Sequence, residues 1–279
     1  MGNYSGAACY TKNFQAGSHC GKEFCRQDSF YINEKGRLRE EAGCDRIRKE
    51  QFWKQAVFWL QRKNRRISMT KEELALEIIR RLKEEYPDAG CTLDYNEAWK
   101  LLVSVRLAAQ CTDARVNVVV QDLYAKYPTV DALAEAEPEE IEAIVRPCGL
   151  GKSKARDISA CMRMLRDEYD GKVPDDFNIL LKLPGVGRKS ANLIMGDVFG
   201  KPAIVTDTHC IRLTNRMGLV DGIKEPKKVE MALWKIIPPE EGSDFCHRLV
   251  MHGREVCTAR TKPYCDRCCL KDICPKIGV

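Results

Sequence analysis

The 279-residue sequence predicts an all-α fold, and three observations support this prediction. From Thr70 to the C-terminus, nearly every segment carries apolar residues at helical spacing. Proline and glycine interrupt these segments, for example at Pro128 and Pro184-Gly185. No segment alternates as a strand does, and the apolar run AIVT at 203–206 is too short to build a sheet.

The first predicted helix begins after Thr70-Lys71-Glu72-Glu73, which has the pattern of a capping box. In this motif the Thr70 oxygen accepts a hydrogen bond from the third helical N–H, while Glu73 reaches back to the backbone of Thr70. The helix continues through LALEIIRRLKEEYP. The other predicted helices cover residues 96–110, 113–127, 130–145, 152–168, 175–182, 188–199, 207–217, 226–237 and 243–256.

Residues 1–68 differ in composition from the rest of the chain. They contain 14 Lys and Arg against 7 Asp and Glu, whereas the remaining residues contain 32 against 33. Nucleic-acid binding by the main part must therefore depend on local sites. Residues 1–45 are polar and aperiodic, which predicts a poorly ordered arm. Residues 46–66 predict a basic amphipathic helix. This helix either contacts nucleic acid or a membrane surface, or it is a solvated extension.

The chain has 15 cysteines but no apolar secretion signal and no apolar run of membrane-spanning length. This combination indicates reduced thiols or a metal site rather than a disulfide framework. We expect a cytoplasmic protein, associated with the nucleoid if the source is bacterial. Cys9, His19, Cys20, Cys25 and Cys44 follow no strong metal-binding pattern.

Near the C-terminus, Cys257, Cys265, Cys268 and Cys274 follow the spacing C-x7-C-x2-C-x5-C, with Cys269 as an extra thiol. Four thiolates in so short and polar a segment predict a metal site that supplies the stability of the segment. Spacing alone allows either a [4Fe–4S] cluster or zinc.

The segment LPGVG, residues 183–187, joins two predicted helices and forms a helix-hairpin-helix motif. We call residues 183–187 the hairpin. Gly185 and Gly187 allow positive φ angles, so the hairpin amides, including that of Val186, can approach a phosphate. The start of the following helix adds a positive dipole end. Such a turn binds a nucleic-acid backbone without reading bases.

Five segments together resemble the endonuclease III family of the helix-hairpin-helix–GPD superfamily, from about Met69 to Val279. They are LAAQCTD at 107–113, CGLGKSKA at 148–155, LPGVGRKSAN at 183–192, VTDTH at 205–209 and the cysteine segment. The resemblance implies that Lys189 is the nucleophile and that Asp207 assists it. It also implies DNA contacts: Gln110 and Leu150 as wedges, His209 at the damaged nucleotide, and Arg260 and Lys262 at phosphates.

An enzyme of this family removes damaged bases, with oxidised pyrimidines expected here, and cleaves the abasic site by β-elimination. An amine nucleophile suits both steps, because its Schiff base with C1′ is the electron sink for β-elimination. The resemblance further implies a monomer that binds damaged or abasic duplex DNA, and a [4Fe–4S] cluster. It implies a helical barrel domain over residues 91–201 and a second domain formed by 70–90 and 202–279.

Three departures from the family pattern are visible. The first cysteine gap is seven residues instead of six, Ser190 replaces a common threonine, and Arg106 stands at a typically apolar position, facing either solvent or DNA. A monofunctional adenine glycosylase of the same superfamily is one alternative, although such enzymes usually lack a lysine at position 189. A non-catalytic DNA-binding module with structural zinc is the other.

Overall fold

The computed structural model describes residues 69–279 together with two short strands, Phe30–Ile32 and Leu38–Glu40. The chain divides into two compact units, residues 1–68 and residues 69–279. Three predictions concern residues outside those described, apart from the two strands. They are the poorly ordered arm, the basic helix at 46–66 and the weak metal-binding potential at Cys9–Cys44.

In the first unit, strands β1 (Phe30–Ile32) and β2 (Leu38–Glu40) pair antiparallel, with Tyr31 opposite Arg39. The sequence did not predict this pairing. Three-residue strands are too short to show the alternation of apolar and polar residues by which strands are recognised.

The second unit is helical, which confirms the predicted fold class for this part of the chain. Its α-helices are α2 (Lys71–Glu85), α3 (Ala98–Leu107), α4 (Asp113–Lys126), α5 (Val130–Glu135), α6 (Pro138–Val145), α7 (Gly151–Tyr169), α8 (Phe177–Leu180), α9 (Arg188–Asp197), α10 (Thr208–Arg216), α11 (Pro226–Leu233) and α12 (Gly242–Glu255). Three short 3₁₀ turns, η1 (Arg146–Cys148), η2 (Pro239–Glu241) and η3 (Cys265–Arg267), complete it.

Helix α2 begins with the predicted capping box, which is confirmed. The Thr70 hydroxyl accepts a hydrogen bond from the Glu73 N–H at 3.2 Å, and the Thr70 N–H donates to the Glu73 carboxylate at 2.8 Å. Two otherwise unsatisfied N–H groups are thereby paired at the start of the helix.

The predicted single helix over 130–145 was wrong, because the structure has two helices there. Helix α5 ends at Glu135, the backbone of Ala136 and Glu137 is extended, and α6 begins at Pro138. Proline disfavours a helical conformation in the residue before it but suits the first position of a helix. The apolar spacing continues across the break, which is why periodicity alone did not reveal it.

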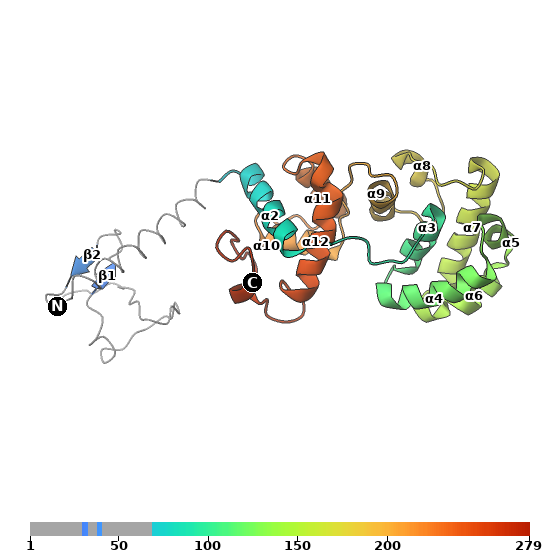
Figure 1. Cartoon of the computed structure of the whole chain (residues 1–279), viewed down its shortest axis with the longest axis horizontal. Helices are drawn as coiled ribbons and strands as arrows, with labels where there is room; N and C mark the ends of the chain where they lie inside the picture. The colour runs from blue at the N-terminus through green and yellow to red at the C-terminus, as the bar shows by residue number, and fades with distance from the viewer. Residues whose placement is uncertain (1–29, 33–37, 41–68) are drawn as a thin grey trace. The chain divides into compact units, whose positions relative to one another are not determined.

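The buried residues of the second unit form two hydrophobic clusters. The first runs from Leu93 to Ala203 and contains apolar residues of α3 to α9. The second joins α2 to residues between Ile204 and Ile273. Figure 1 shows α2, α10, α11 and α12 grouped together, with α9 between them and the other helices. We propose that the clusters are the cores of two domains, residues 91–201 and residues 70–90 with 202–279.

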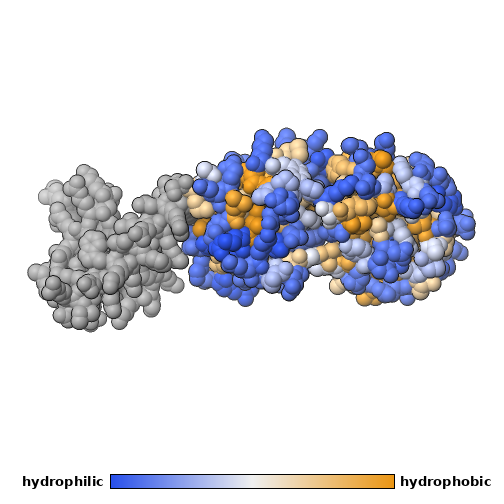
Figure 2. Space-filling view, turned by 45° about the horizontal axis from the view of Figure 1, so that its top comes forward, coloured by the Kyte–Doolittle hydropathy of each residue, from blue (hydrophilic) through white to orange (hydrophobic). Residues whose placement is uncertain are grey.

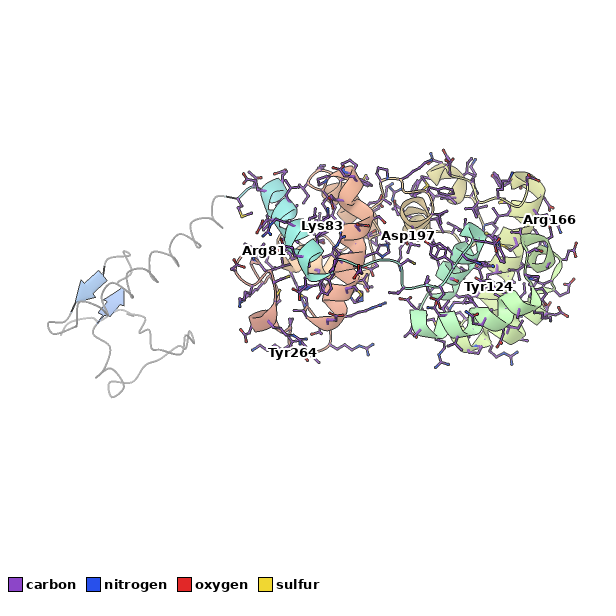
Figure 3. All side chains as sticks on the ribbon, viewed as in Figure 1. Arg81, Lys83, Tyr124, Arg166, Asp197 and Tyr264 are labelled. Atoms are coloured by element: carbon purple, nitrogen blue, oxygen red, sulfur yellow. The ribbon has the colours of Figure 1, made fainter. Side chains whose placement is uncertain are left out.

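Helix α2 is also bound to later parts of the chain by ion pairs and a hydrogen bond. Arg81 pairs with Asp272 at 2.5 Å and donates to the carbonyl of Cys269 at 2.9 Å, while Lys83 pairs with Glu241 at 2.5 Å. Figure 3 labels Arg81 and Lys83 on this helix. Because Arg81 and Asp272 are both mostly buried, their pair fixes the position of α2 beside the cysteine segment more firmly than a surface pair would.

The surface of the second unit is mainly hydrophilic on the face shown in Figure 2, where smaller hydrophobic areas interrupt it. None of the helices that the structure describes combines the length and the apolar character needed to cross a membrane.

Candidate active site and cysteine loop

The hairpin connects α8 to α9 and depends on Gly185 for two reasons. Gly185 has φ +76°, and a Cβ there would lie 2.9 Å from side-chain carbons of both Arg106 and Asp157. The expectation of positive φ at Gly187 was wrong, because its φ is −96°. A Cβ at Gly187 would meet open space. The Val186 N–H donates to the Leu183 carbonyl at 3.1 Å, so the turn closes on itself.

Arg106 faces neither solvent nor an open DNA surface. Its guanidinium pairs with Asp157 of α7 at 2.6 Å and donates to the Ser153 hydroxyl at 3.2 Å. The side chain is about four-fifths buried, beneath Gly185. This arginine therefore supports the hairpin from inside the protein.

Lys189 is the second residue of α9, directly after the hairpin. Gly187 is the N-cap of this helix, and no side chain in the described part of the protein caps it. The backbone N–H groups of the first turn of α9 therefore carry the positive end of the helix dipole without a side-chain acceptor.

Lys189 and Asp207 line the same pocket, which has about 750 Å³ of space, including the part open to solvent. We call it the lysine pocket. Its wall combines residues from α3, α4, α9, α10's N-cap and α12 with the segment before α3. The two sequence-predicted catalytic residues are thus brought together, although 18 positions separate them.

Asp207 is the N-cap of α10. Capping is compatible with a catalytic role for the same carboxylate. The carboxylate accepts a hydrogen bond from the Cys210 N–H at 2.7 Å. The Val205 N–H donates to the Cys246 sulfur at 3.2 Å, which holds the segment before Asp207 against α12. Capping therefore fixes the orientation of the carboxylate while one of its oxygens stays unused by the cap.

Two charged residues of the lysine pocket, Asp113 and Arg254, were not predicted to have a function. They form an ion pair at 2.7 Å, and the Thr92 hydroxyl donates to the same Asp113 oxygen at 2.7 Å. Burial opposes ionisation of Asp113. The hydrogen bonds from Thr92 and Arg254 and the charges of Arg254 and Lys189 outweigh burial and lower its pKa. Asp113 lies in LAAQCTD, a visible signal, whereas only the fold brings Arg254 near it.

His247 of α12 also lines the lysine pocket and was not predicted. Its Nε2 lies 2.7 Å from a carboxylate oxygen of Asp197, and both side chains are almost fully buried. Figure 3 labels Asp197 where α9 faces α12. A buried carboxylate fixes the ring orientation and the tautomer of a histidine.

His209 is the second residue of α10 and lies two positions after Asp207. It is half-buried. A Cβ on Gly253 would lie 2.4 Å from the His209 ring, so the ring packs directly on that glycine. Arg212 lies 3.3 Å from its Nδ1. Burial lowers the pKa of His209; Asp207 opposes this, while Arg212, Arg254 and Lys189 add to it. His209 is therefore a neutral ring near physiological pH.

Gln110 and Leu150 share an unusual backbone conformation. Both have positive φ, 57° and 52°, and among the described residues only Asp170 and Lys276 share this feature without being glycine. Leu150 is 57% exposed although it is a large apolar residue, and Gln110 is exposed as well. A strained backbone under an exposed side chain is typical of functional positions.

The cysteine loop, residues 257–274, follows α12. Cys257, Cys265, Cys268 and Cys274 line one cavity, which also includes His252 and Arg216; Cys269 does not line it. Within residues 69–279 and the two described strands, no three His, Cys, Asp or Glu side chains are placed to hold one metal ion.

Several donors point at the sulfur atoms of the cysteine loop. Arg216 donates to the Cys257 sulfur at 3.3 Å, and the N–H groups of Leu270 and Lys276 donate to Cys268 and Cys274 at 3.4 Å. His252 Nε2 lies 3.4 Å from the Cys268 sulfur. Such donors suit thiolates, the form in which cysteine binds metals.

Arg260 and Lys262 lie on the exposed part of the cysteine loop, between Cys257 and Cys265. Hydrogen bonds between Thr258 and Thr261 shape this part, and Arg267 lies over the ring of Tyr264, which Figure 3 labels. The side chains of Arg260 and Lys262 are open to solvent, as a phosphate contact requires.

Comparisons with known proteins agree on the kind of protein. Residues 103–239 match the family model described as HhH-GPD superfamily base excision DNA repair protein. Endonuclease III of Synechocystis sp. is 43% identical over 207 residues, covering 74% of this chain and 94% of that protein. Endonuclease III of Escherichia coli is 40% identical over 199 residues, covering 71% and 93%.

The chain belongs to the endonuclease III family. Solved structures agree with this assignment. A trapped endonuclease III–DNA covalent intermediate has a TM-score of 0.70 and 41% identity, covering 75% of this chain and 97% of that one. A non-covalent endonuclease III–DNA complex also has a TM-score of 0.70. The family resemblance expected for residues 69–279 is confirmed.

Proposed function

We propose that this member of the endonuclease III family is a bifunctional DNA glycosylase and AP lyase, which excises damaged bases from duplex DNA. The observation that supports this most directly is the lysine pocket. The pocket is lined by the amine of Lys189, which follows the hairpin, and by the carboxylate of Asp207, which precedes α10. We further propose oxidised pyrimidines as the substrate class.

In the proposed reaction, the Lys189 amine attacks C1′ of the target nucleotide and the bond from C1′ to the base nitrogen breaks. The departing base takes up the proton that the amine loses, and the C1′–O4′ bond then opens with protonation of O4′ to give the Schiff base. The Schiff base acidifies the 2′ hydrogens, and loss of one of these protons forms the C2′–C3′ double bond and breaks the C3′–O3′ bond, which expels the 3′ phosphate. Asp207 stabilises the positive charge that develops on the sugar. The helix cap on one Asp207 oxygen holds the carboxylate in place for this task without reorganisation.

The remaining residues of the lysine pocket set its electrostatics. Asp113 is held ionised by Arg254 and Thr92, so the pair presents a fixed dipole beside Lys189. We propose that this pair orients the Lys189 ammonium before deprotonation, and that Arg254 contributes to binding of the flipped nucleotide. His209, as a neutral ring beside Asp207, is proposed to contact that nucleotide.

Binding of DNA is assigned to the surface around the pocket. We propose that Gly185, Val186 and Gly187 approach a phosphate together with the start of α9, at the open space beside Gly187. Gln110 and Leu150 would enter the base stack as the damaged nucleotide leaves it. We also propose that the exposed loop cations Arg260 and Lys262 contact DNA phosphates.

We propose that Cys257, Cys265, Cys268 and Cys274 hold a [4Fe–4S] cluster. The four side chains surround one cavity, and N–H donors from Arg216, Leu270 and Lys276 already point at three of the sulfurs. When bound, the cluster would cross-link a loop that has little apolar surface of its own. Cys269 instead presents its carbonyl to Arg81 of α2.

A reaction on chromosomal DNA is consistent with a cytoplasmic protein, and we propose association with the nucleoid if the source is bacterial. We also propose that the protein acts as a monomer. The two alternatives are not favoured. A monofunctional adenine glycosylase needs no amine nucleophile, and a non-catalytic zinc module needs neither Lys189 nor Asp207 in a pocket.

Borohydride trapping on duplexes with thymine glycol, an abasic site or 8-oxoguanine opposite adenine tests the proposal. We expect the wild-type protein to nick the first two and to form a covalent adduct, and Lys189→Gln to lose nicking and trapping but still bind DNA. The matched control is Lys224→Gln, an exposed lysine away from the pocket. Adduct formation by Lys189→Gln would place the nucleophile elsewhere. Adenine release without an adduct would favour the adenine glycosylase.

A further inference from the structure

Lys154, in the second turn of α7, is a fully buried lysine. Its side chain is 0% exposed, and its ammonium donates to two backbone carbonyls, those of Leu107 and Cys148, each at 2.8 Å. No carboxylate in the described residues pairs with it. Burial lowers its pKa, as expected for an ammonium removed from water without a counter-charge. Such a costly arrangement calls for a function.

The two carbonyls belong to the ends of two different elements. Leu107 is the last residue of α3, so its carbonyl lies at the negative end of that helix dipole. Cys148 is the last residue of η1. Because one nitrogen binds both oxygens, Lys154 fixes the distance between the end of α3 and the turn before α7.

Each of these ends leads directly into one of the strained, exposed residues. Gln110 follows Leu107 by three positions, and Leu150 follows Cys148 by two. The Lys154 N–H also donates to the Leu150 carbonyl at 3.0 Å, so the residue is bonded to Leu150 through its backbone and to Leu107 and Cys148 through its side chain. The ammonium is therefore the shared anchor of the two segments that carry Gln110 and Leu150.

We propose that Lys154 is a positioning residue that sets the spacing between Gln110 and Leu150, so that both side chains enter the same step of the base stack. This inference rests on the proposed function, in which the two residues replace an extruded nucleotide. Lys154 does not touch DNA in this proposal. It acts through two backbone carbonyls.

A buried lysine could instead serve only to hold the core together. The two possibilities differ in the substrates that they affect. A core function supports the lysine pocket and the stack-entering residues alike. The positioning function matters only where a base must leave a stacked duplex, and not where the abasic sugar is already unstacked.

The test compares two activities of Lys154→Met, which fills the same volume but cannot bind carbonyls. One activity is thymine glycol excision from duplex DNA; the other is β-elimination at an abasic site in single-stranded DNA. We expect duplex excision to fall about 10- to 100-fold, while cleavage of the single strand changes by less than about threefold. The control Lys172→Met removes an exposed lysine just beyond α7 and should change neither activity.

A 2-aminopurine placed opposite the lesion reports directly on the stack. Its fluorescence should rise when the wild-type protein binds, and Lys154→Met should lose most of that rise. Equal loss of both activities, or no loss of either, would overturn the proposal. If Lys154→Met does not fold, Lys154→Gln is measured in the same way, since its amide keeps a donor on a shorter stem.

Different results would refute the proposed function and the proposed role of Lys154. If the wild-type protein forms no borohydride adduct, the proposed function itself is wrong. If it forms the adduct but never raises the 2-aminopurine signal, Gln110 and Leu150 do not enter the stack, and the assignment of Lys154 falls with them.

Discussion

The ion pair between Arg188 and Glu230 gives the sharpest test of how the site is held. Arg188 is the first residue of α9, next to Lys189, and its guanidinium makes two hydrogen bonds to the Glu230 carboxylate, at 2.6 and 2.7 Å. Glu230 lies on α11, so the pair joins α9 to the second hydrophobic cluster. The guanidinium also lies over the ring of Phe177, 5.0 Å from its centroid.

The two partners differ in burial, and this difference sets the expected magnitudes. The Glu230 side chain is 2% exposed, whereas Arg188 is 33% exposed. Arg188→Met leaves a carboxylate buried without its counter-charge, which costs about 3–5 kcal/mol. Glu230→Gln leaves a guanidinium that water can reach, so we expect a loss of only about 1 kcal/mol. At about 2–4 °C per kcal/mol for a unit of this size, Arg188→Met should lower the Tm by roughly 6–20 °C.

Urea unfolding of the purified protein measures both variants and the double variant. The double variant should be more stable than Arg188→Met alone, because Glu230→Gln removes the uncompensated charge. Equal destabilisation by the two single changes, or strict additivity in the double variant, would refute the reasoning. Either result would mean that the carboxylate is not held in a water-excluded pair.

Other changes test separate features. Cys268→Ser should lose the iron and the brown colour of the purified protein, whereas Cys269→Ser should keep both, as iron analysis and absorbance will measure. Gly185→Ala should lower the free energy of unfolding by about 2 kcal/mol, since it combines positive φ with a collision. Gly187→Ala should leave stability within about 0.5 kcal/mol but weaken DNA binding if a phosphate lies there. Deletion of residues 1–68 should leave excision and lyase rates nearly unchanged while flattening the salt dependence of binding to undamaged duplex.

Local signals in the sequence were sufficient to predict that residues 69–279 are helical. The capping box at Thr70, the apolar spacing of α2 to α12 and the glycines of the hairpin each depend on interactions within a few residues. The break at Pro138 was missed because the apolar spacing continues across it. Gly187 was misjudged because a glycine in a turn serves either a positive φ or a close approach, and the sequence does not distinguish them.

The site was only partly predictable for a different reason. Lys189 and Asp207 were visible because they lie in compact motifs. Arg254 and His247 lie in a helix whose pattern shows only that one face is buried; their partners, Asp113 and Asp197, are far away in sequence. Lys154 lies within CGLGKSKA, yet nothing in the sequence indicates that a lysine there is fully buried. Pairings across the chain require the fold.

The route of the chain through the two hydrophobic clusters has a consequence for biosynthesis. The first cluster is built from a continuous segment, so it can form as soon as that segment has left the ribosome. The packing of helix α2 is delayed, because its apolar residues Ala75, Ile78 and Leu82 pack against residues that begin at Ile204. At about 5–20 residues per second, the delay is on the order of 10 s. During that interval the nascent protein carries an amphipathic helix with an uncovered apolar face, a target for chaperones and proteases until translation reaches the C-terminal helices.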